Sequence, residues 1–198
     1  MPRGKPKLTF ADVMDGFKKR VTVAVGETPI TVFVCGPHVK KLLKGGGRNK
    51  GAAIRYHVSK QLGRISCVYV WGEHKKLRSA APKELNRYFS DAEKEIMFAT
   101  DSVVDLVVIF PSSSGSLAEL GAFALEDDIA KKMLIIFDDE HRGSKGFVVD
   151  GLMKSARKRN AVVRFRSYRD RDAVWGVVRD RIRMLQSLKV KRTWKESS

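Results

Sequence analysis

The sequence predicts an α/β fold: a doubly wound sheet of about five mainly parallel strands with helices on both faces. Five short apolar runs rich in β-branched residues punctuate the chain. Nearly continuous runs of this kind are typical of strands buried on both faces of a parallel sheet. Their spacing is that of strand–helix units, which favours crossover connections over hairpins.

The strands follow from these runs, because each run is four to six residues long and is bounded by polar or glycine-containing segments. The predicted strands are Ile30–Cys35, Cys67–Trp71, Leu106–Phe110, Met133–Phe137 and Ala161–Phe165.

Helices are expected between the strands, where apolar residues recur at helical spacing. The helix at Glu84–Thr100, for example, places Leu85, Phe89, Ala92, Ile96 and Ala99 on one face. The predicted helices are Ala52–Leu62, Glu84–Thr100, Ser116–Lys132 and Ala173–Leu188.

The domain organisation predicted from these elements has three parts. Residues 1–28 form a basic N-terminal segment, in which Val21–Val25 is a candidate extra strand pairing with the first strand as a hairpin. Residues 29–188 form the α/β domain, and 189–198 form a frayed basic tail. Within the domain, 37–51 combines three consecutive glycines with several lysines and arginines, which is typical of a mobile basic loop.

The charge of the chain is strongly positive. Lys and Arg number 39 against 22 Asp and Glu, which gives a net charge of +17. Residues 154–198 carry 15 Lys/Arg and 4 Asp/Glu, hence +11. This asymmetry indicates an anionic partner, most often nucleic acid, and a solvated basic surface is the alternative. The candidate nucleic-acid-binding residues are Arg157, Lys158, Arg159, Arg164 and Arg166.

Several function classes are excluded or disfavoured by what the sequence lacks. No run approaches 18 apolar residues, and the polar N-terminus has no secretory apolar region, so we expect a cytoplasmic protein with no membrane contact. The chain contains no GxxxxGK[ST], no GxGxxG after a strand and no GxSxG. Its histidines are isolated and its two cysteines lie in apolar runs, so we expect no metal and no cofactor.

The segment from Asp105 to Phe123 carries the candidate site. It runs from a buried strand through a small polar loop into a helix. Ser112, Ser114 and Ser116 place hydroxyls around Gly115, where free helix N–H groups favour an anion such as a phosphate. Sugar hydroxyls are an alternative ligand for the same turn.

Glu119 follows in the same helix, and two interpretations of it are open. Ser116-Leu-Ala-Glu119 matches the S-x-x-E capping box, in which a glutamate only satisfies an N-cap amide. Alternatively, Glu119 is a reactive carboxylate directed at the same edge of the sheet, where the helix N-terminus favours its charged form.

Phe110-Pro-Ser-Ser-Ser-Gly-Ser-Leu-Ala-Glu-Leu-Gly-Ala-Phe-Ala resembles the signature of nucleoside deoxyribosyltransferase-like proteins, in particular the small effector toxins of retron anti-phage systems. Val32-Phe-Val-Cys-Gly36-Pro37 is similar to that family's first strand and glycine turn, and Arg55 follows in the first helix. Glu95 and Asp101, before Asp105, resemble the acidic helix end that precedes its central strand. The resemblance covers about residues 30–140.

The resemblance implies a Rossmann-like fold and cleavage of an N-glycosidic bond in nucleosides, nucleotides or NAD. Glu119 is then the nucleophile or the stabiliser of an oxocarbenium-like state, and Asp101, Asp105 and Glu95 are candidate partners. Asp105 beginning a strand and Glu95 facing solvent are the alternatives. The other implied substrate-binding residues are Gly36, Pro37, Arg55, Ser112, Ser114, Gly115 and Ser116.

The resemblance also implies a biological role and partners. The expected role is a toxin in retron defence, restrained by a reverse transcriptase bearing a DNA–RNA hybrid, and a homo-oligomer is possible. The transferases usually carry an acidic residue where this chain has Ser112–Ser114, which favours hydrolysis over transfer to a second base. Two other functions remain open: a non-catalytic nucleotide sensor, and a basic nucleic-acid-binding adaptor.

Overall fold

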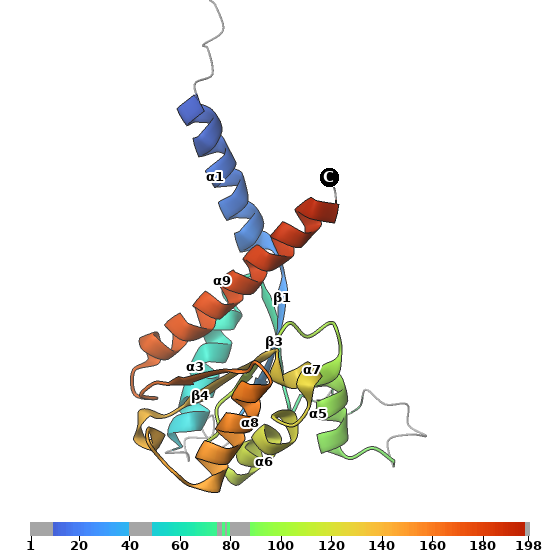
Figure 1. The fold of residues 1–198 in the computed structure, drawn as a ribbon, viewed down its shortest axis with the longest axis vertical. Coiled ribbons are helices and arrows are strands. Elements are labelled where there is room, and N and C mark those ends of the chain that lie inside the picture. The colour runs from blue at the N-terminus through green and yellow to red at the C-terminus, as the bar shows by residue number, and fades with distance from the viewer. Residues whose placement is uncertain (1–9, 40–48, 75–76, 78, 80–87, 197–198) are drawn as a thin grey trace, which may run out of the picture.

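A computed structural model describes residues 10–39, 49–74, 77, 79 and 88–196. Its centre is a five-stranded, fully parallel sheet in the order β2-β1-β3-β4-β5. Figure 1 shows the sheet with its surrounding helices. The predicted Rossmann-like α/β class is therefore confirmed. The strands are β1 (Ile30–Cys35), β2 (Cys67–Trp71), β3 (Leu106–Ile109), β4 (Met133–Phe137) and β5 (Val162–Phe165), each within a residue of the range that its apolar run predicts.

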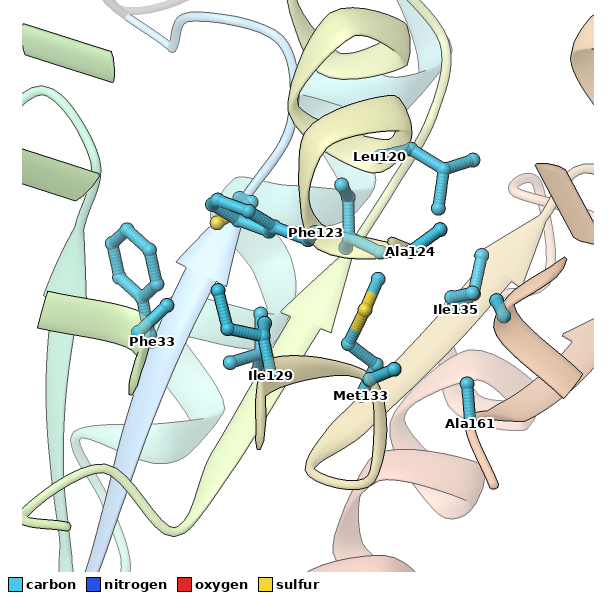
Figure 2. Packing of buried hydrophobic residues seen from close by; sticks show 14 of the residues in the cluster. Phe33, Leu120, Phe123, Ala124, Ile129, Met133, Ile135 and Ala161 are labelled. Atoms are coloured by element: carbon cyan, nitrogen blue, oxygen red, sulfur yellow. The ribbon is translucent and has the colours of Figure 1, made fainter. Parts of the chain in front are cut away.

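Helices cover both faces of the sheet. Alternate side chains of β1, β3 and β4 point to opposite faces, so each face builds its own apolar core. Figure 2 shows the first core, where Phe33, Met133 and Ile135 meet Phe123 and Ala124. The helices of this face are α5 (Asp91–Thr100), α6 (Ser114–Phe123), α7 (Asp127–Ala130) and α8 (Leu152–Lys158).

The second face is covered by α3 (Lys50–Leu62) and α9 (Arg171–Glu196). Ile54 and Val58 of α3, with Val174 and Val178 of α9, pack against the side chains of β1, β3 and β4. Short helical segments, η1 (Asp139–His141) and η2 (Phe147–Gly151), connect β4 to α8.

The extra strand predicted at Val21–Val25 is wrong. These residues lie in α1 (Phe10–Glu27), which packs on α9 away from the sheet (Figure 1). Both edges of β1 are already occupied by β2 and β3, so a hairpin partner has no free edge to join. Tertiary packing therefore overrides the β-propensity of the valines.

Two other boundaries differ from the sequence prediction. The helix predicted over Ser116–Lys132 is divided into α6 and α7, and Asp127 and Asp128 occupy the first turn of α7, where carboxylates are favourable. The frayed tail predicted from residue 189 is helical as far as Glu196, because Gln186 and Val190 are buried against the domain.

The remaining predicted segments fall partly outside the described residues. Residues 40–48 of the predicted basic loop and 84–87 of the helix predicted over Glu84–Thr100 are not described. The described part of that helix begins at Asp91 and not before it, because Ser90 caps α5. Among the residues that are described, no helix has the length and apolar character that crossing a bilayer requires.

Candidate functional site at the carboxyl edge of the sheet

The candidate site lies where the winding of the sheet reverses. β1 is followed along the chain by β2 on one side, whereas β3, β4 and β5 extend on the other. The loops after β1 and β3 diverge at this point, which is where open α/β sheets bind ligands. Gly36 and Pro37 leave β1 there, and the serine loop leaves β3.

The serine loop is organised around its own hydrogen bonds. Ser113 is the N-cap of α6: its Oγ accepts from the Ser116 N–H at 3.2 Å, and the Ser116 Oγ accepts from the Ser113 N–H at 2.9 Å. The capping box is therefore Ser113–Ser116, and the alternative that pairs Ser116 with Glu119 is overturned. Glu119 lies one turn further along the helix and has no capping role.

The predicted substrate-binding residues of this loop differ in their exposure and in the hydrogen bonds that they already make. Ser116 is 1% exposed and its hydroxyl is occupied within the turn, where it also accepts from the Ser112 N–H. Ser114 and Gly115 are exposed. The Ser112 Oγ is buried with no hydrogen-bond partner among the described residues. Ser114 is thus accessible to a ligand, whereas the Ser112 Oγ is buried against α3 and Ser116 shapes the turn.

Glu119 is the most perturbed carboxyl group of the site. Burial, followed by the negative charge of Glu95, raises its pKa to about 8, against the opposing effect of Arg55. The Gly36 N–H hydrogen-bonds this carboxyl group, and its Oε2 is buried without a partner among the described residues. The expectation that the helix N-terminus favours the charged form is therefore wrong, because desolvation dominates.

Glu95 of α5 completes an acid pair with Glu119. Its partly buried side chain lies against the turn after β2: a Cβ built on Gly72 falls 2.7 Å from the Glu95 Oε1. Its charge acts on both Glu119 and the buried thiol of Cys35, whose pKa is raised chiefly by burial. Glu95 thus faces the site and not the solvent.

Arg55 of α3 is buried under the same edge. Its guanidinium donates to the carbonyls of Gly36 and Pro37, at 2.8 and 3.1 Å, and forms a bidentate pair with Glu73. The side chain is 1% exposed, so its predicted role as a substrate-binding residue is corrected. Pro37, also predicted to bind substrate, is buried and supplies one of these carbonyls.

Asp101 and Asp105 are not brought to Glu119. Both precede β3 and lie at the amino edge of the sheet, the end opposite to α6. Asp101 accepts from the Val103 N–H, while Asp105 accepts from the Thr31 N–H and from Lys189, each at 2.8 Å. Their predicted catalytic roles are corrected, and the alternative that Asp105 only begins the strand is the one the geometry supports.

The predicted nucleic-acid-binding residues do not form one cluster. Arg157, Lys158 and Arg159 end α8, which packs on one face of the sheet, and Arg159 pairs with Asp127 at 2.7 Å. Arg164 shares its side of β5 with Val162, which packs into the core on the other face, and Arg166 follows the strand. Nucleic-acid binding by these residues stays a prediction.

Glu73 and Ser113 are the site residues that sequence reasoning missed. Glu73 follows β2 by two positions, so the rule that parallel strands bring their carboxyl ends to one edge was a usable signal. Ser113 was hidden by the competing S-x-x-E match three residues later. Among the described residues, no three His, Cys, Asp or Glu side chains are grouped to hold a metal ion.

The fold and the site together define a Rossmann-like α/β protein with a partly buried acid pair at the switch point of its sheet. Residues 68–197 match the family model described as STM3845 retron effector protein, and the chain belongs to this family. The match begins in β2 and continues through α9, so it includes Glu73, Glu95 and Glu119.

A curated relative gives a second, shorter similarity. The Escherichia coli protein named "Retron Ec86 putative ribosyltransferase/DNA-binding protein" is 34% identical over 58 residues, 29% of this chain. The matched region spans about a fifth of that relative's length, 19%. The chain is therefore a retron effector with an α/β fold.

Proposed function

We propose that this retron effector is an N-glycosidase that cleaves the base–sugar bond of a nucleoside, a nucleotide or NAD. The observation that carries the proposal is the partly buried acid pair Glu119–Glu95 at the carboxyl edge, beside the serine loop. N-glycosidic cleavage needs one group that stabilises positive charge on the sugar and one that protonates the leaving base, and two carboxyl groups supply both.

The raised pKa of Glu119 suits these two catalytic roles. Because burial and the negative charge of Glu95 raise the pKa of Glu119 to about 8, the Glu119 carboxyl group is largely protonated near neutral pH. The neutral carboxyl group donates its proton to the departing base. The ionised carboxylate stabilises the oxocarbenium-like sugar or attacks its anomeric carbon, and water completes the hydrolysis.

The loops at the switch point supply contacts for the rest of the substrate. The exposed Ser114 and Gly115 lie in the first turn of α6, where sugar hydroxyls or a phosphate find donors. The E. coli relative's name, which includes ribosyltransferase, supports chemistry at a sugar. The same name includes DNA-binding, and this supports the proposal that the basic residues of this chain contact nucleic acid.

The proposal is tested by incubating the purified protein with nucleosides, nucleotides, NAD and single-stranded DNA and following free base by chromatography. Glu119→Gln removes the titrating group while conserving its size, so we expect base release to fall at least about 100-fold. Glu126→Gln is the matched control, because Glu126 is exposed and makes no side-chain capping bond. Full activity of Glu119→Gln contradicts the proposal.

A non-catalytic nucleotide sensor makes the opposite forecast in the same experiment. It binds a nucleotide through the serine loop, releases no base and signals equally well with Glu119→Gln. A wild-type protein that binds one member of the panel and leaves it intact, in the presence of its retron partners, would favour the sensor.

A further inference from the structure

Arg55 and Glu73 form a buried ion pair that the proposed chemistry does not use. The Arg55 Nη1 donates to the Gly36 carbonyl and its Nη2 to the Val34 carbonyl, at 2.8 and 2.7 Å. A guanidinium with both terminal nitrogens engaged by backbone and one carboxylate has little capacity left for a ligand. The Arg55 contacts instead fix the backbone conformation of the residues at the end of β1 and just after it.

Glu73 makes the burial of this guanidinium possible. Its Oε1 and Oε2 accept from Arg55 at 3.0 and 2.6 Å, and its side chain is 12% exposed. Bidentate arginine–carboxylate pairs fix orientation as well as contributing energy. Removing one partner leaves a buried charge uncompensated, so the two residues act as a unit.

Gly36 connects this pair to Glu119. Its carbonyl accepts from Arg55, and its N–H hydrogen-bonds the Glu119 carboxyl group. Gly36 has φ +143, and a Cβ built on it falls 3.2 Å from the Phe110 carbonyl oxygen and 3.3 Å from the Arg55 Cδ. The turn at Gly36 thus packs closely between Phe110 and Arg55, and both residues restrict the orientation of the Gly36 peptide.

We propose that Glu73 and Arg55 are positioning residues that act through Gly36, holding its N–H on the Glu119 carboxyl group while their opposite charges cancel beside it. The catalytic part of this inference rests on the proposed N-glycosidase function. The positional part concerns the protein without substrate and does not rest on that function.

The charges that face Glu119 come from each element around it. Glu95 lies on α5, Arg55 on α3 and Glu73 after β2, where His38 approaches Glu73 at 3.9 Å; the raised pKa keeps the Cys35 thiol of β1 neutral. Arg55 lowers the pKa of Glu119, whereas Glu73 raises it. Neutralising Glu73 therefore leaves the Arg55 charge uncompensated and shifts the titration of Glu119 to lower pH.

The test compares Glu73→Gln, Glu73→Asp and the exposed control Glu126→Gln with the wild-type chain. Carbon-13 NMR of labelled glutamates follows the titration of Glu119, assigned by its loss in Glu119→Gln. We expect Glu73→Gln to move this midpoint down by roughly one pH unit. We also expect kcat for base release to fall about 10- to 100-fold with KM nearly unchanged, and Glu73→Asp to recover part of it.

The NMR titration needs no substrate, so it judges the inference even if the protein releases no base. A folded Glu73→Gln protein in which the Glu119 midpoint stays at the wild-type pH overturns the inference that the Arg55 and Glu73 charges cancel beside Glu119. An unchanged kcat in an active, folded Glu73→Gln protein overturns its catalytic consequence. If Glu73→Gln lowers the melting temperature but changes neither the Glu119 midpoint nor kcat, the Arg55–Glu73 pair only stabilises the fold, and the inference is again overturned.

Discussion

The folded protein disfavours the ionised form of the Glu119 carboxyl group. Its pKa is raised from 4.5 to about 8, chiefly by burial. The unfolded chain is deprotonated between these two pH values while the folded protein still binds the proton, so the free energy of unfolding falls as the pH rises through this window. The stabilising neutral form is fully present below about pH 4.5.

Glu119→Gln is therefore expected to flatten this pH dependence. The amide is neutral at every pH, so at pH 8 the variant should be more stable than the wild type by about 1–3 kcal/mol. At pH 5, where the wild-type carboxyl group is protonated in the fold, the difference should nearly vanish. Urea unfolding at both pH values measures this, and equal stabilities at pH 8 would count against a buried, protonated Glu119.

At the scale of the element, the approach of α3 to the serine loop depends on one glycine. A Cβ built on Gly51, in the first turn of α3, falls 1.6 Å from the Ser112 Oγ and 2.8 Å from its Cβ. No rotation of a hydroxyl relieves the second contact, so α3 or the loop after β3 must move. The glycine thus sets the distance between two elements that frame the site.

Gly51→Ala is expected to destabilise the protein by about 1–3 kcal/mol, with a matching loss of substrate affinity. Gly176→Ala is the matched control: Gly176 also lies in a helix, α9, but a Cβ there meets nothing within 4 Å. That substitution should stabilise the protein by about 0.5–1 kcal/mol, because alanine is the better helix former. Thermal unfolding of both variants checks this, and a stabilising Gly51→Ala would refute the close approach.

The elements that sequence predicted well are those whose local pattern matches their final environment. The central strands β3 and β4 are short apolar runs buried on both faces, so the run and the strand nearly coincide, as for Met133–Phe137, whereas the edge strands β2 and β5 are partly exposed. Val21–Val25 has the composition of a strand but lies in α1, because β1 has no free edge. The acid partner of Glu119 could not be chosen locally either, since Asp101, Asp105 and Glu95 differ in the edge of the sheet they reach.

Over the whole molecule, the carboxyl edge and the amino edge of the sheet have different roles. The carboxyl edge gathers Glu119, Glu95 and the Arg55–Glu73 pair. The amino edge secures the long helix α9 to the start of β1, where Gln186 donates to the Thr28 carbonyl. Figure 1 shows α9 crossing the sheet and meeting the end of α1 nearest the sheet, beyond which the two helices diverge. The amino edge is therefore expected to contribute stability and not catalysis.

Asp105 tests this division, because sequence reasoning placed it in the active site. Its carboxylate, 14% exposed, accepts from Lys189 of α9 and from the Thr31 N–H. Asp105→Asn keeps an acceptor for Thr31 but loses the charge opposite Lys189, and should lower the free energy of unfolding by about 1–2 kcal/mol. Any base release by the folded protein should be unchanged, since the substitution lies at the edge opposite Glu119.

The control is Asp128→Asn, which breaks the exposed Asp128–Lys131 pair on α7 and should leave the unfolding midpoint unaltered. Urea titration and base release are measured on the same preparations. If Asp105→Asn abolished base release while retaining wild-type stability, the catalytic site would have to extend to the amino edge. The opposite pattern, reduced stability with full activity, follows from a sheet whose parallel strands put chemistry at one end and anchorage at the other.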